Sequence, residues 1–215
     1  MLPGTFPVFP LQTVCFPGHR IPLRIFEPRY LQMLKDIAEA PAFVIALISS
    51  GKEVGEAATP YRVGTLVDFD EVTEEGVTQF IAPVGRVRVE IKRFDRSSQP
   101  YLLAECVAYQ DEPENPVDKG RMERLRDQLW AAAKKHASGT EDGVDSIFKR
   151  ARKQFNDENY SLFLCGCLTM PTIYQQRLLE MRHGPNRLDN ANNLLSKAFK
   201  GRQGSKDSNT DEGWV

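Results

Sequence analysis

The amino-acid sequence predicts an α+β fold in which a small, partly open β-barrel with one helix precedes a bundle of helices. Up to about residue 112, short β-type runs alternate with glycine and proline, and beyond it helix-forming residues dominate. Many short strands separated by turn residues are typical of barrels, whereas apolar residues at three-to-four spacing are typical of helices. The stretch 111–116, DEPENP, carries two prolines at this change and predicts a linker.

These patterns predict three parts: a barrel subdomain over residues 1–112, a helical bundle subdomain over 117–200 and a disordered tail over 201–215. The tail reads GRQGSKDSNTDEGWV, which is polar, rich in glycine and serine, and without period. Within the barrel one helix is expected to begin at Pro28, because the fixed φ of proline suits the first helical turn.

Five strands are expected in the barrel, at 42–48, 61–69, 77–84, 86–91 and 101–109. The run 42–48 is continuously apolar, which predicts a strand buried on both faces. The run 86–91 alternates, which predicts one apolar face and one charged face. Its apolar members are Val87, Val89 and Ile91, and its charged members are Arg86, Arg88 and Glu90. The alternation breaks at Arg93-Phe94, which indicates a bulge or a strand end.

Composition excludes several classes of protein. The 215 residues carry 28 Lys and Arg against 29 Asp and Glu, so no global field draws the chain to nucleic acid or an anionic membrane. The longest apolar run is far shorter than the ~20 residues that span a bilayer. Prolines interrupt the N-terminal segment MLPGTFPVFP, so no signal peptide is expected. Four cysteines are too few for a disulfide framework, which predicts reduced thiols and a cytoplasmic location.

Motifs of catalysis and metal binding fail when they are tested. The only Gly-Lys pair, Gly51-Lys52, lacks the other residues of a P-loop, and no G-x-S-x-G occurs. The three histidines, His19, His136 and His183, are isolated, and Cys165 and Cys167 have no second ligand pair. We therefore predict no catalytic residue, no metal and no cofactor. An enzyme whose pocket is lined by Asp68 and Asp70 stays open as a third hypothesis.

The densest basic stretch lies between residues 86 and 96. It contains Arg86, Arg88, Lys92, Arg93 and Arg96. Such a strand either follows the phosphates of RNA or forms the charged, wet face of an edge strand, and the second interpretation is favoured here.

One ordered set of motifs gives the chain a family resemblance. Between residues 9 and 34 it contains Pro10-Leu11, Phe16-Pro17-Gly18, Pro22-Leu23, Ile25-Phe26-Glu27 and Arg29-Tyr30, in that order. Val63-Gly64-Thr65-Leu66, Gly85, Arg93-Phe94, Gln176, Leu178-Leu179-Glu180 and Arg187-Leu188 follow. With these residues the chain resembles, over about 6–200, the N-terminal domain of Lon proteases.

The resemblance implies a PUA-like barrel followed by a helical bundle, in a non-catalytic domain that engages protein substrates. It also implies that the ATPase and Ser-Lys protease modules of Lon lie outside this segment. Ser196-Lys197 is an adjacent pair and does not match the family's dyad, whose members lie far apart.

Two binding functions follow as hypotheses. The first is a non-enzymatic polypeptide-binding module, a substrate-recognition adaptor for proteolysis whose partners are unfolded or tagged polypeptides and a protease or chaperone. Its expected contacts are surface aromatic residues near the junction of barrel and bundle: Phe16, Phe26, Phe94 and Tyr101. The alternative is an RNA-binding PUA-like module that uses Arg86, Arg88, Lys92 and Arg93.

Overall fold

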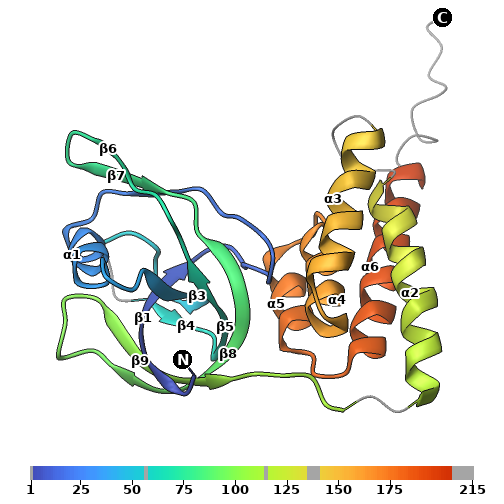
Figure 1. Cartoon of the computed structure of the whole chain (residues 1–215), viewed down its shortest axis with the longest axis horizontal. Helices are drawn as coiled ribbons and strands as arrows, with labels where there is room; N and C mark the ends of the chain where they lie inside the picture. Colours follow the sequence, from blue (N-terminus) through green and yellow to red (C-terminus); the bar gives the residue numbers. More distant parts are fainter. Residues whose placement is uncertain (1, 56–57, 114–115, 135–140, 205–215) are drawn as a thin grey trace, which may run out of the picture.

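A computed structural model describes residues 2–55, 58–113, 116–134 and 141–204. The barrel and the helical bundle lie side by side along the long axis of the molecule, and the chain passes between them once after β9 (Figure 1). The predicted fold class is confirmed. Among the described residues, no helix has both the length and the apolar character that crossing a bilayer requires.

Five strands form the barrel, and their ring is closed. In order around the ring they are β1 (Gly4–Leu11), β9 (Leu102–Ala108), β8 (Val84–Asp95), β5 (Val63–Asp68) and β3 (Ala42–Ser50). A parallel pairing of β1 with β3 closes the ring, with Val8 opposite Val44. The barrel is thus less open than expected, because a parallel pair has no connecting hairpin whose turn residues could announce it. A short strand, β4 (Thr59–Pro60), extends the sheet beyond β3.

A second sheet of three strands accompanies the barrel. Its order is β2 (Leu23–Ile25), β7 (Thr78–Ile81) and β6 (Thr73–Glu75), so β2 and β6 are its edges. Helix α1 (Pro28–Asp36) follows β2 and begins at the predicted proline. The expected strand 77–84 is divided, because β7 ends at Ile81 and β8 begins at Val84.

Strand β8 carries a bulge at Arg86, where the predicted alternating strand 86–91 was expected to begin. Leu66 of β5 lies opposite Val87, but the next residue, Val67, lies opposite Gly85, which leaves Arg86 as an extra residue. Beyond the bulge the predicted alternation continues, because residues 87–90 pair in unbroken register with β5. The predicted exposure is wrong, however, since Val87 is exposed and Arg88 is buried. A second register shift, between Ile91 and Arg93, lies where the sequence predicted an irregularity.

The bundle consists of five helices in the described part of the chain. They are α2 (Pro116–Lys134), α3 (Glu141–Gln154), α4 (Asp157–Gly166), α5 (Thr172–Glu180) and α6 (Gly184–Gly204). Helix α4 contacts the other four and so lies at the centre of the bundle. Helix α6 runs beyond the boundary predicted at residue 200, and the rest of the predicted tail, 205–215, lies outside the described residues, as does His136.

His19 joins the barrel to the bundle at the loop before β2. Its ring stacks on Phe163 of α4 with centroids 4.9 Å apart, and its Nε2 lies 2.8 Å from the Phe163 carbonyl oxygen. A Cβ on Gly166 would lie 2.5 Å from this ring, so the glycine between the two cysteines leaves room for His19. Cys165 is fully buried and Cys167 is exposed, and this Cys-Gly-Cys sequence is a packing feature of α4.

Stability should depend on the protonation of His19. Burial lowers the pKa of His19 below 6.5, although the hydrogen bond to Phe163 opposes the shift. The unfolded chain then binds more protons than the folded chain between the two pKa values. The contribution of neutral His19 to the free energy of unfolding should be fully present above about pH 6.5. It should fall as the pH drops through 6.5 toward the folded pKa. Urea unfolding of the wild type and His19→Gln across this range measures the effect, and equal pH slopes for the two would contradict it.

Candidate functional site

The structure separates the four aromatic residues that were predicted to contact polypeptide. Phe16 and Tyr101 are only 2% and 5% exposed, so their prediction as surface contacts is wrong. Phe16 packs in the core shared by barrel and bundle, and the Tyr101 hydroxyl donates to the Asp36 carboxylate at 2.8 Å inside the barrel end. Phe94 is half-buried and lies near two arginine guanidinium groups. Of these four residues, only Phe26, which is 46% exposed, presents its ring to solvent.

The predicted basic strand carries little uncompensated charge. Each exposed cation predicted for RNA contact has a carboxylate beside it: Arg86 pairs with Asp68 at 2.6 Å, Lys92 with Glu90 at 2.7 Å, and Arg93 with Glu105. Phosphate recognition depends on excess positive charge, which these pairs reduce. The RNA-binding interpretation therefore gains no support from β8.

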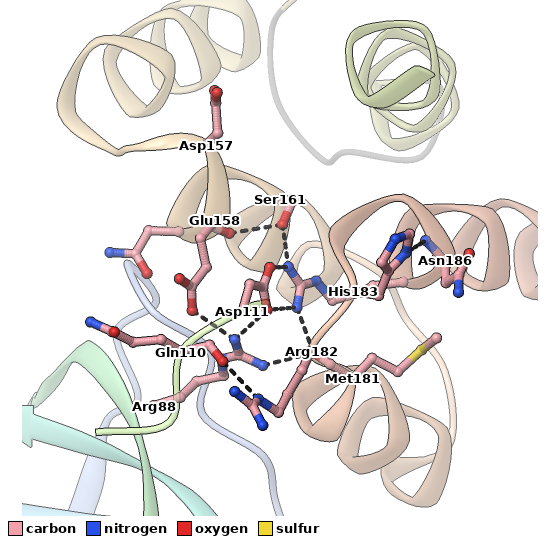
Figure 2. Close-up of polar contacts among 12 residues, drawn as sticks. Arg88, Gln110, Asp111, Asp157, Glu158, Ser161, Met181, Arg182, His183 and Asn186 are labelled. Carbon is pink, nitrogen blue, oxygen red and sulfur yellow. Dashed lines mark hydrogen bonds and ion pairs between the residues drawn. The ribbon is translucent and has the colours of Figure 1, made fainter. Parts of the chain in front are cut away.

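The remaining member of that set, Arg88, lies inside the junction of barrel and bundle and cannot be a surface contact (Figure 2). Its Nη2 donates to Asp111 at 2.5 Å and to Glu158 at 2.6 Å. Its Nη1 donates to the carbonyl oxygens of Leu179 and Met181, at 2.8 Å each. Residues of α4 and of the end of α5 cover this face of β8, so the expected surface cation links the two parts.

Asp111 is shared by two buried arginines. Arg187 of α6, also buried, donates through Nη1 to Asp111 at 2.9 Å, through Nη2 to the second carboxylate oxygen, and to the Ser161 hydroxyl at 2.8 Å. Burial opposes ionisation of Asp111, but the two guanidinium groups outweigh it and hold its pKa below the ordinary value. The start of the predicted linker is thus fixed in the core. We name Arg88, Asp111, Glu158 and Arg187 the junction cluster.

A surface hollow lies on the second sheet. It has a volume of about 680 Å³ and opens to solvent. Its lining comes from the segment around β2, from β7 and from the loop that leads into β6: Arg20, Pro22, Leu23, Arg24, Phe69, Asp70, Glu71, Thr73, Phe80, Ile81 and Ala82. We call it the β2–β7–β6 hollow.

The register of the sheet fixes how this hollow is arranged. Phe80 on the central strand lies opposite Arg24 on one side and opposite Thr73 on the other. Cross-strand partners share a face, so the half-buried Phe80 ring lies between an arginine edge and an edge that leads to Asp70 and Glu71. The hollow therefore has an apolar centre, a cationic side and an acidic side.

Exposed apolar side chains surround the same sheet. Phe26 follows β2, Val72 precedes β6 and is 44% exposed, and Val77 at the tip of the β6–β7 hairpin is 82% exposed. Figure 1 shows this hairpin projecting from the barrel on the side away from the helices. Apolar residues gathered beside a hollow mark a contact surface more strongly than scattered ones do.

Only Asp70 among the residues that line the hollow, and Phe26 beside it, were predicted from the sequence as candidate site residues. A usable signal was present, because residues 20–26 alternate: Arg20, Pro22, Arg24 and Phe26 are exposed, while Ile21, Leu23 and Ile25 point inward. Asp68, which was considered together with Asp70, pairs with Arg86 and does not line the hollow, so the carboxylate pair of the third hypothesis is not formed there. In the described ranges, no three His, Cys, Asp or Glu side chains are grouped as metal ligands.

A closed five-stranded barrel followed by a helical bundle defines a class of α+β domain, and solved structures share this fold. The N-terminal domain of the Mycobacterium avium complex Lon protease has a TM-score of 0.69 at 13% identity, covering 90% of this chain and 98% of that one. The Lon N-terminal domain protein from Xanthomonas campestris has a TM-score of 0.58 at 20% identity, with the same coverage. No curated protein matches the chain.

The family model for the substrate-binding domain of the ATP-dependent protease La (LON) matches residues 5–197. The chain belongs to this family, and the resemblance found in the sequence is confirmed. Membership supports a module that binds polypeptide.

Proposed function

We propose that this chain is a non-catalytic polypeptide-binding module that acts as a substrate-recognition adaptor for proteolysis, and that it binds its substrates at the β2–β7–β6 hollow. The observation that carries the proposal is the position of Phe80 in an open hollow with Phe26 exposed beside it. Family membership supplies the class of ligand, and the hollow supplies a place for it.

The mechanism we propose is shallow apolar contact with an extended segment. Covering one large apolar side chain stabilises a complex by about 1.5–3 kcal/mol, and much of this gain offsets the cost of association. The edge strand β6, whose three residues are all exposed, offers backbone groups to a neighbouring chain as well. We expect affinities of about 10–100 μM, which suit a module that captures unfolded segments and passes them on.

Titration of the purified chain with a fluorescently labelled, permanently unfolded protein tests the site. The change Phe26→Ser should weaken binding by about tenfold, because it removes most of one aromatic contact. Ile147→Ser is the matched control, since Ile147 is 57% exposed but lies on α3 of the bundle. Equal affinities for both variants and the wild type would contradict the assignment of the hollow.

The non-catalytic part of the proposal has its own test. We expect the pure chain to release neither phosphate from ATP nor new amino termini from casein. If the chain turned over either substrate, and a point substitution in the chain abolished that turnover, the non-catalytic part of the proposal would be overturned.

A further inference from the structure

The β2–β7–β6 hollow differs from the exposed face of β8 in how its charges are compensated. Arg20 and Arg24 lie on its β2 side, and Asp70 and Glu71 lie on its β6 side. Within the part of the chain that the structure describes, none of the four has an oppositely charged partner within ion-pair distance. The exposed cations of β8, by contrast, each have a carboxylate at their side.

Existing contacts hold the arginines where they are. Arg20 donates from Nη1 to the Ala82 carbonyl oxygen at 2.9 Å, and the Arg24 guanidinium lies 5.8 Å from the centre of the Phe26 ring. Neither contact neutralises the positive charge. A ligand that supplied a carboxylate on this side would therefore meet cations already positioned by the fold.

The two charged sides are separated by a distance that an extended peptide can span. Arg24 on β2 and Thr73 on β6 lie opposite Phe80 on either side of β7, so these two positions are two strand spacings apart, about 10 Å. Asp70 and Glu71 lie in the loop that leads into β6. In an extended chain, residues that face one side are two apart, so the neighbours at i−2 and i+2 of a central residue lie about 13 Å from each other. Flexible arginine and glutamate side chains accommodate the small difference.

We infer that the hollow selects extended segments in which one large apolar residue is flanked, two positions away on each side, by one acidic and one basic residue. The apolar side chain would cover Phe80, the acidic residue would face Arg20 and Arg24, and the basic residue would face Asp70 and Glu71. This inference rests on the proposed function, because it specifies which polypeptides that site takes.

Four dansylated peptides with a common Trp test the inference. Their central sequences are Glu-Ser-Trp-Ser-Lys, Glu-Ser-Trp-Ser-Glu, Lys-Ser-Trp-Ser-Lys and Ser-Ser-Trp-Ser-Ser, and binding to the full chain is measured by anisotropy at low salt. The mixed peptide should bind about five- to tenfold more tightly than the other three, since exposed ion pairs contribute modestly. The preference should disappear in 0.5 M salt, where such pairs are screened.

Variants assign the two sides separately. The double change Arg20→Ala and Arg24→Ala should remove the benefit of the peptide's glutamate only, and Asp70→Asn with Glu71→Gln should remove the benefit of its lysine only. Glu112→Gln, at an exposed position after the barrel, is the control of matched charge. Equal binding of all four peptides would overturn the inference and leave the proposed function standing. Failure of every peptide and of an unfolded protein to bind would overturn both.

Discussion

Replacement of Asp111 by Asn should lower the free energy of unfolding by about 3–5 kcal/mol, because it leaves two buried guanidinium groups without their shared counter-charge. Arg88 and Arg187 have fully buried side chains, and each donates to this one carboxylate. Each also has an Nε that is buried without a hydrogen-bond partner, so both guanidinium groups are already incompletely satisfied. Arg88 keeps Glu158 after the change, whereas the ion pair of Arg187 is made with Asp111. Urea unfolding followed by circular dichroism measures the loss.

The exposed pair of Arg86 and Asp68 provides the control for this prediction. Its side chains are 45% and 40% exposed, so Asp68→Asn should cost less than about 1 kcal/mol. Because the folded pKa of Asp111 is depressed, its contribution is present above the unfolded pKa near 4 and is lost as the pH falls through the lower folded value. Similar losses for Asp111→Asn and Asp68→Asn would mean that the junction cluster does not hold barrel and bundle together.

Replacement of Gly85 by Ala should cost about 3 kcal/mol, through overpacking against main chain that cannot move aside. A Cβ at this position would lie 2.3 Å from the Phe16 carbonyl oxygen. The surrounding backbone is fixed by two hydrogen bonds, from Gly18 N–H to the Gly85 carbonyl at 2.8 Å and from Gly85 N–H to the His19 carbonyl at 2.9 Å. Displacing Phe16 would disturb the turn at Gly18, whose φ of 83° is left-handed.

The matched control for Gly85→Ala is a glycine whose replacement should have the opposite sign. Gly120 lies within helix α2, and the nearest atom to a Cβ there is 3.8 Å away. Gly120→Ala should stabilise the chain by about 1 kcal/mol through helix propensity. Thermal unfolding of both variants distinguishes the two effects, and a Gly85→Ala protein as stable as the wild type would refute the steric argument.

Local patterns predicted much of the fold because they depend on neighbouring residues. Helix α1 begins at Pro28, as predicted, and the continuous apolar run at 42–48 forms the buried strand β3. The pairing of β1 with β3 could not be read in the same way, since it joins strands that no turn connects. The bulge at Arg86 escaped for a related reason, because a bulge is set by the partner strand.

The site was predicted less well than the fold. Four aromatic residues were expected as surface contacts near the junction of barrel and bundle, yet Phe16 and Tyr101 are covered by segments that are distant in sequence. Phe80 was not considered, because nothing in a single sequence says that the β6–β7 hairpin and the segment before α1 form one surface.

Taken by itself, the sequence determined the α+β class, the order of barrel and bundle, and membership of the family of Lon substrate-binding domains, since these depend on periodicity and on short motifs in order. Only the tertiary structure decided which charges are neutralised. Arg88 and Arg86 are two residues apart, but one is buried between two carboxylates and the other is paired at the surface, while Arg20 and Arg24 remain uncompensated beside an open hollow. Ion pairing depends on distances between side chains in space, and those distances are set by register and packing.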